Sequence, residues 1–120
     1  MTTPLGDMEI AAALRTLPGW TRRGETLTRV YRFASFRDAL AFMVRAGFEA
    51  EAVNHHPEWT NVYNRVGVRL TTHDAGGITK KDVDLAATEE VLLQVGGGSV
   101  FGCVSTSTYS ALFTRLLSCL

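Results

Sequence analysis

The sequence predicts an α+β fold: a two-layer sandwich with one four-stranded antiparallel sheet and helices packed on one face. Helical periodicity alternates with pairs of extended segments, in the order helix, two strands, helix, two strands, helix. Each pair of extended segments is joined by a short turn, which is typical of antiparallel hairpins and not of βαβ units. The 120 residues suffice for one domain and its core.

The first helix is expected from Asp7, a suitable N-cap residue, to the helix-terminating pair Pro18-Gly19. Its apolar residues recur at helical spacing: Ile10, Leu14 and Leu17.

The first hairpin is expected to begin at Trp20 and to turn at Gly24-Glu25. Leu27, Tyr31 and Phe33 alternate onto one face of its second strand. Arg29 falls on that same face and is an exception to the pattern.

The second helix is expected over residues 35–52, because Ser35 and Asp38 have the spacing of a capping box. We expect its sheet-facing side to be the apolar stripe formed by Phe36, Leu40, Met43, Val44 and Gly47.

The second hairpin is expected over residues 58–73, with a turn near Asn64. Its second strand alternates Val66, Val68 and Leu70 with polar or small residues, as in a half-buried strand. Trp59 and Tyr63 are expected to share one face of its first strand.

The third helix is expected to begin at Thr79, where Thr79 and Asp82 again have capping-box spacing. Residues in helical phase follow: Val83, Ala86, Ala87, Glu90 and Val91. Residues 1–95 form the expected domain. Residues 96–120 are expected to be a Gly-rich linker and an apolar tail, which is either a docked helix, a partner-binding or membrane-surface helix, or poorly ordered.

Composition excludes several functions. Twelve basic and 12 acidic residues give a formal net charge of zero, so no basic excess favours direct nucleic-acid binding. The sequence lacks an apolar run of about 20 residues, so no membrane span is expected. No secretory signal is visible at its start. The two cysteines, Cys103 and Cys119, form no CxxC motif, which favours a reducing, cytoplasmic environment.

The chain contains three histidines: the adjacent pair His55 and His56, followed by Pro57, and His73 at the end of the second hairpin. Pro57 favours an extended conformation at His56, so the two adjacent rings are expected to point in different directions. A zinc site is one interpretation, but adjacent histidines close poorly on one ion and no HExxH spacing exists. General acid/base chemistry is the other, since imidazole donates and accepts protons near neutral pH.

The pattern Glu51, His55-His56-Pro57, Tyr63, His73 and Asp82 resembles the signature of the pterin-4a-carbinolamine dehydratases. The likeness also includes "GW" at 19–20 and "FRDALAFM" at 36–43, and it covers roughly residues 8–95. It implies an α+β sandwich and a cofactor-free enzyme that converts 4a-hydroxytetrahydropterin to quinonoid dihydropterin and water.

The resemblance also implies roles for individual residues. His55 and His73 are expected to be the acid/base pair, with His56 orienting the substrate. The residues expected to line the pterin or support its site are Trp20, Glu51, Asn54, Thr71, Thr72, Asp74 and Asp82. Two positions depart from the family pattern: Asn54 replaces a frequent Asp, and Lys81 stands where some relatives have Arg.

The family likeness also implies partners. A homo-oligomer, dimer or tetramer, is expected. Because some relatives act as dimerisation cofactors of a homeodomain transcription factor, the alternative is a protein-binding module that uses its helical surface.

Overall fold

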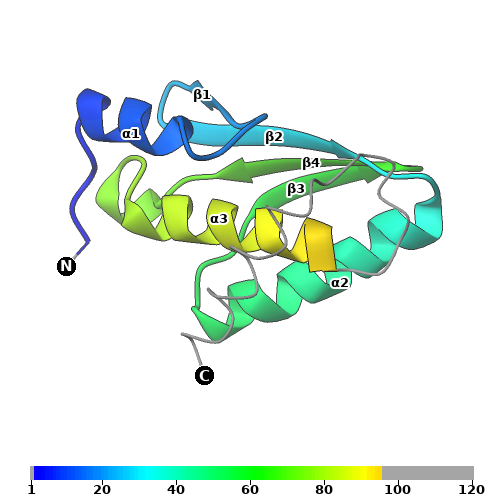
Figure 1. Ribbon diagram of the computed structural model, residues 1–120. Coiled ribbons are helices and arrows are strands. Elements are labelled where there is room, and N and C mark those ends of the chain that lie inside the picture. The colour runs from blue at the N-terminus through cyan, green and yellow to red at the C-terminus, as the bar shows by residue number, and fades with distance from the viewer. Residues whose placement is uncertain (1, 96–120) are drawn as a thin grey trace.

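The computed structural model describes residues 2–95 and shows two antiparallel hairpins joined into one sheet (Figure 1). In chain order, the elements are α1 (Asp7–Leu14), β1 (Thr21–Arg23), β2 (Thr26–Arg32), α2 (Phe36–Ala52), β3 (Glu58–Val62), β4 (Arg65–Leu70), the 3₁₀ turn η1 (His73–Ala75) and α3 (Lys80–Val95). Helices α2 and α3 pack together across one face of the sheet (Figure 1). The predicted α+β sandwich is therefore confirmed.

The sheet has the strand order β1-β2-β4-β3, and all neighbouring strands are antiparallel. The inner strands pair with Leu27 opposite Leu70 and Tyr31 opposite Val66. The predicted alternation in β4 is confirmed, because Val66, Val68 and Leu70 are buried under the helices. Both predicted turns are also confirmed, between Arg23 and Thr26 and between Val62 and Arg65.

Helix α1 begins one residue earlier than expected. Gly6 is the N-cap, with extended backbone geometry, and its N–H donates to the Glu9 carboxylate at 2.9 Å. Asp7 lies in the first turn, where its carboxylate pairs with Arg22 at 2.7 Å. The prediction of Asp7 as N-cap is wrong, since the capping interaction here comes from Glu9.

The sheet-facing side of α2 also differs from the expectation. Ser35 caps this helix as predicted, accepting from the Asp38 N–H at 3.2 Å. Its buried residues, however, are Ala39, Phe42, Ala46 and Ala50. The expected residues Phe36, Leu40 and Val44 are 45%, 47% and 51% exposed, respectively. Together with Phe48, at 73%, they form an outward apolar stripe on α2.

Arg29, the exception on the inner face of β2, is accommodated by a polar cluster. Its Nε lies 3.4 Å from Glu90 Oε1 on α3, and its guanidinium lies over the Tyr31 ring at 4.7 Å. The same Glu90 oxygen accepts from Trp20 Nε1 at 3.0 Å and from the Tyr31 hydroxyl at 3.1 Å. Gly19 leaves room for this arrangement, because a Cβ there would lie 1.1 Å from Arg29 Nη1.

The predicted linker and apolar tail at 96–120 lie outside the described residues. Within residues 2–95, no helix is both long and apolar enough to cross a membrane.

Candidate active site

The end of α2 determines where His55 lies. The Asn54 N–H donates to the Glu51 carbonyl at 3.1 Å, and the His55 N–H donates to the Ala50 carbonyl at 3.0 Å. These are the two hydrogen bonds of a Schellman motif, which requires a left-handed residue between helix and loop. Asn54 is that residue, with φ of 50°. Its backbone conformation accounts for an amide side chain here, since Asn adopts this region more readily than most residues.

We therefore expect Asn54→Val to destabilise the fold by about 1–2 kcal/mol, the cost of placing a side chain with Cβ branching in the left-handed region. Asn54→Gly, which accepts this conformation freely, is the matched control and should remain close to wild type. Chemical denaturation of both variants tests the expectation. Equal stability of the Val and Gly variants would contradict it.

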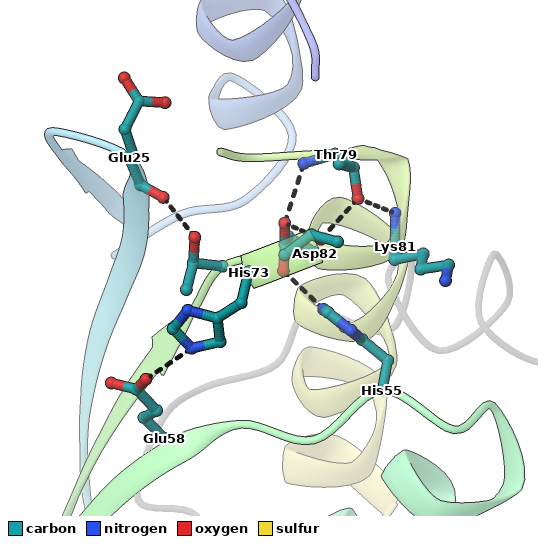
Figure 2. Close-up of polar contacts among 9 residues, drawn as sticks. Glu25, His55, Glu58, His73, Thr79, Lys81 and Asp82 are labelled. Atoms are coloured by element: carbon teal, nitrogen blue, oxygen red, sulfur yellow. Dashed lines mark hydrogen bonds and ion pairs between the residues drawn. The ribbon is translucent and has the colours of Figure 1, made fainter. Parts of the chain in front are cut away.

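His55 forms a buried pair with Asp82. Its Nε2 lies 2.6 Å from Asp82 Oδ1, and the two side chains are 10% and 0% exposed, respectively. Asp82 lies in the first turn of α3, whereas His55 follows the end of α2. The pair therefore joins the two helices at the end of the sheet where β4 leads into η1 (Figure 2).

The second oxygen of Asp82 is also occupied. Oδ2 accepts from the Thr79 backbone N–H at 2.8 Å and from the Thr72 hydroxyl at 2.9 Å. Thr72 and Thr79 share a further hydrogen bond of 2.7 Å between their hydroxyls, and Thr79 Oγ1 accepts from the Lys81 N–H at 3.2 Å. Asp82 thus caps α3 as predicted and holds His55 at the same time.

His73 lies beyond β4, directly after Thr72, and its ring is bound by a different carboxylate. Its Nε2 lies 2.9 Å from Glu58 Oε1, and the two side chains are 76% and 51% exposed. Figure 2 shows His55 and His73 coming from different segments to the same end of α3, with Asp82 between them in this view. Thr72 links the two groups, since its hydroxyl binds Asp82 and its chain neighbour is His73.

His56 also binds a carboxylate. Its Nε2 lies 2.7 Å from Glu51 Oε2, and the two side chains are 56% and 77% exposed. His55 is buried and His56 is exposed, so the two adjacent rings lie in different environments, consistent with the extended backbone that Pro57 favours.

All three imidazoles therefore bind a carboxylate through Nε2. A carboxylate only accepts hydrogen bonds, so Nε2 carries the proton in each pair. In the neutral ring, Nδ1 is then the nitrogen with the free lone pair. This arrangement can accept a proton at Nδ1 and, once the ring is protonated, donate it back.

The remaining expected site residues divide into two groups. Thr71 and Asp74 flank the Thr72-His73 segment, and the Thr71 hydroxyl donates to the Glu25 carbonyl at 2.7 Å. Trp20 lies apart from the histidines, since it is 4% exposed and its indole binds Glu90, two helical turns beyond Asp82. Tyr63, which the signature includes, is 67% exposed in the β3–β4 turn.

Glu58 is the site residue that the sequence analysis did not identify. The two-residue turn after Val62 determines the strand register, which places Glu58 directly opposite Arg69 and near the segment that leads to His73. The short turn predicted near Asn64 was the one feature of the sequence from which this register, and thus the position of Glu58, could have been inferred. Glu58 and Arg69 also lie along an open groove of about 530 Å³, which crosses the face of the sheet away from α2 and α3.

The alternative of a metal site receives no geometric support in the described part of the chain. Among residues 2–95, no group of three or more His, Cys, Asp or Glu side chains is placed so that it could hold one ion. Each histidine has its own carboxylate instead.

Comparison with known proteins identifies the family. Residues 3–92 match the family model for pterin 4 alpha carbinolamine dehydratase. Two curated relatives carry the name "Putative pterin-4-alpha-carbinolamine dehydratase". The one from Opitutus terrae is 57% identical over 80% of this chain and 100% of its own length. The one from Solibacter usitatus is 55% identical over 77% of this chain and 97% of its own length.

Two solved structures are also similar. The "transcriptional coactivator/pterin dehydratase" from Brucella melitensis has a TM-score of 0.74 and 40% identity, over 76% of this chain and 99% of its own. A pterin dehydratase-like RuBisCO assembly factor of the alpha-carboxysome, 20% identical, shares the fold with a TM-score of 0.52, over 67% of this chain and 89% of its own. The chain belongs to the pterin-4a-carbinolamine dehydratase family.

Proposed function

We propose that this protein is a dehydratase that converts 4a-hydroxytetrahydropterin to quinonoid dihydropterin and water. The observation that carries the proposal is that His55 and His73 lie at the same end of α3 (Figure 2), each with Nε2 bound to a carboxylate and Nδ1 left to accept a proton. Family membership supports the substrate class.

The reaction needs two proton movements. The N5–H bond breaks, the N5 electrons form the N5–C4a double bond, and the C4a–O bond breaks as the hydroxyl leaves with an added proton as water. One imidazole accepts the N5 proton and a second, protonated imidazole donates to the leaving oxygen. Such assistance contributes roughly 10²–10⁴-fold, a suitable scale for a carbinolamine that already loses water spontaneously.

In this proposal, His55 and His73 carry the protons and His56 orients the substrate. Asp82 positions His55 by holding its Nε2. The substrate-lining groups are drawn from the surrounding segments: Glu51, Asn54, Thr71, Thr72 and Asp74. Trp20 is not among these groups, because its indole is buried against Glu90. No cofactor is required by this chemistry.

Stopped-flow measurement of carbinolamine decay tests the proposal. The purified protein should accelerate the decay, and His55→Ala and His73→Ala should each remove most of that acceleration. Absence of acceleration by the wild-type protein, or full activity of the His73→Ala variant, would overturn it.

The alternative function is that of a protein-binding module. It is favoured by the outward apolar stripe on α2 and by the similarity to the Brucella transcriptional coactivator/pterin dehydratase, which is 40% identical. Retained binding of a helical partner after replacement of all three histidines, together with no acceleration of carbinolamine decay, would favour this alternative.

We also propose that a second copy of the chain covers the outward apolar stripe, giving the homo-oligomer expected from the family likeness. The double variant Val44→Glu/Phe48→Glu should then weaken self-association by more than about tenfold, because two charges would be buried in an apolar interface. Sedimentation across a concentration series measures this, with Met8→Glu on α1, where Met8 is 88% exposed, as the control. A wild-type protein that remains at 13.1 kDa at every concentration would contradict it.

A further inference from the structure

Glu58 differs from the other two carboxylates that bind histidines because its second oxygen faces a charged side chain, whereas the second oxygen of Asp82 accepts from Thr79 and Thr72. Its Oε1 binds His73 Nε2 at 2.9 Å, while its Oε2 faces Arg69 Nη1 at 4.0 Å. Arg69 lies on β4 directly opposite Glu58 on β3. Both residues stand on the sheet, a rigid element, whereas His73 lies on the short turn η1.

The exposure of His73 explains why such a contact matters. The His55 ring is enclosed by the protein, with its side chain 10% exposed, but the His73 side chain is 76% exposed. An exposed imidazole samples several rotamers, and only some of them direct Nδ1 toward a substrate held at His55. A carboxylate fixed to the sheet can select one rotamer and one tautomer of the ring.

We propose that Glu58 is the positioning residue of His73, and that Arg69 holds Glu58 in place for this task. The inference rests on the proposed dehydratase function. It gives the site two histidine–carboxylate pairs of different character: His55–Asp82 is buried and fixed by packing, and His73–Glu58 is exposed and fixed by the sheet register.

The segment around Pro57 acquires a second role in this arrangement. His55, two residues before Pro57, belongs to the buried pair, and Glu58, directly after Pro57, belongs to the exposed pair. Proline restricts the backbone between them and so limits how far the two pairs can shift relative to each other.

Kinetics can separate positioning from direct substrate contact. Glu58→Ala should lower kcat roughly two- to fivefold with little change in KM, the scale of an exposed ion pair. Glu58→Gln, whose amide oxygen still accepts from Nε2, should recover part of this loss. In the His73→Ala background, Glu58→Ala should leave the residual rate unchanged, because Glu58 acts only through His73. An equal loss in both backgrounds would overturn the proposal.

Arg69→Ala should show the same dependence on Glu58, with a loss in the wild type and none after Glu58→Ala. Glu49→Ala, which removes an exposed carboxylate from α2, is the control and should retain full activity. A loss with Arg69→Ala that persists after Glu58→Ala would overturn the role of Arg69.

Three-bond couplings to the His73 imidazole carbon, measured by NMR, give a readout that does not depend on activity. They should report one rotamer in the wild type and averaging in Glu58→Ala, with His55 unchanged in both. Averaged His73 couplings in the wild type would overturn the positioning role even if the enzyme is active. Inactivity of the wild type with a fixed His73 rotamer would instead count against the proposed function alone.

Discussion

Asp82→Asn should lower the rate of carbinolamine dehydration by roughly 10²–10⁴-fold while leaving the fold largely intact. The asparagine oxygen can keep the two hydrogen bonds from Thr79 N–H and Thr72 Oγ1 that Asp82 Oδ2 accepts. The amide NH₂ then faces His55 Nε2, which must become an acceptor, so the neutral ring carries its proton on Nδ1. His55 Nδ1, the nitrogen proposed to accept the substrate proton, then already carries a proton in the neutral ring and cannot accept another.

The control for this variant is Asp84→Asn, which makes the same chemical change on α3 at a side chain that is 63% exposed and pairs with Lys80 at 3.7 Å. It should retain wild-type activity. Nitrogen-15 NMR of the histidine rings should show the tautomer of His55 reversed in Asp82→Asn only. An Asp82→Asn variant with the reversed tautomer but full activity would show that His55 does not act through Nδ1.

Much of this site could be predicted from the sequence because its chemistry lies in local motifs. The His-His-Pro segment, His73 and the capping residue Asp82 are all visible as residue types at characteristic spacing. Glu58 was missed because its contact with His73 depends on strand register, not on a local motif. The left-handed backbone of Asn54 explains its presence without any appeal to charge.

The error in α2 has a different physical origin. This helix has apolar residues on two faces, with one containing Ala39, Phe42, Ala46 and Ala50 and the other the outward apolar stripe. Periodicity alone cannot choose between two apolar faces, and the larger side chains suggested the wrong one. Alanines are buried because they allow the helix backbone to approach its neighbours closely.

The helical phase of α3 was likewise predicted only in part. Ala86 is buried as expected, and Val83 and Ala87 pack partly against the core. Of the two adjacent glutamates, Glu89 is fully buried and Glu90 is only partly buried. Glu90 accepts from Trp20 and Tyr31, whereas both carboxyl oxygens of Glu89 are buried without a hydrogen-bond partner in the described structure.

Burial, together with the nearby Glu90 carboxylate, raises the pKa of Glu89 to about 8 from its ordinary 4.5. In the unfolded chain, Glu89 loses its proton near pH 4.5, whereas in the folded protein it keeps the proton until about pH 8. The folded state therefore binds more protons in this window, and its stability falls as the pH rises through it. At about 1.4 kcal/mol per pH unit, the loss is on the order of 3–5 kcal/mol, a large part of a typical domain stability.

Replacing Glu89 should therefore change both the stability and its pH dependence. Glu89→Leu should raise the free energy of unfolding at pH 5 by about 1–3 kcal/mol, because an unpaired buried carboxyl is replaced by an apolar side chain. The difference in the free energy of unfolding between Glu89→Leu and the wild type should grow further between pH 5 and pH 8. Glu89→Gln, which cannot ionise but leaves a buried polar group, should flatten the pH dependence without the gain at pH 5. Denaturation of the three proteins across this range is the measurement, and a parallel pH dependence of wild type and Glu89→Gln would show that Glu89 is not the group that titrates.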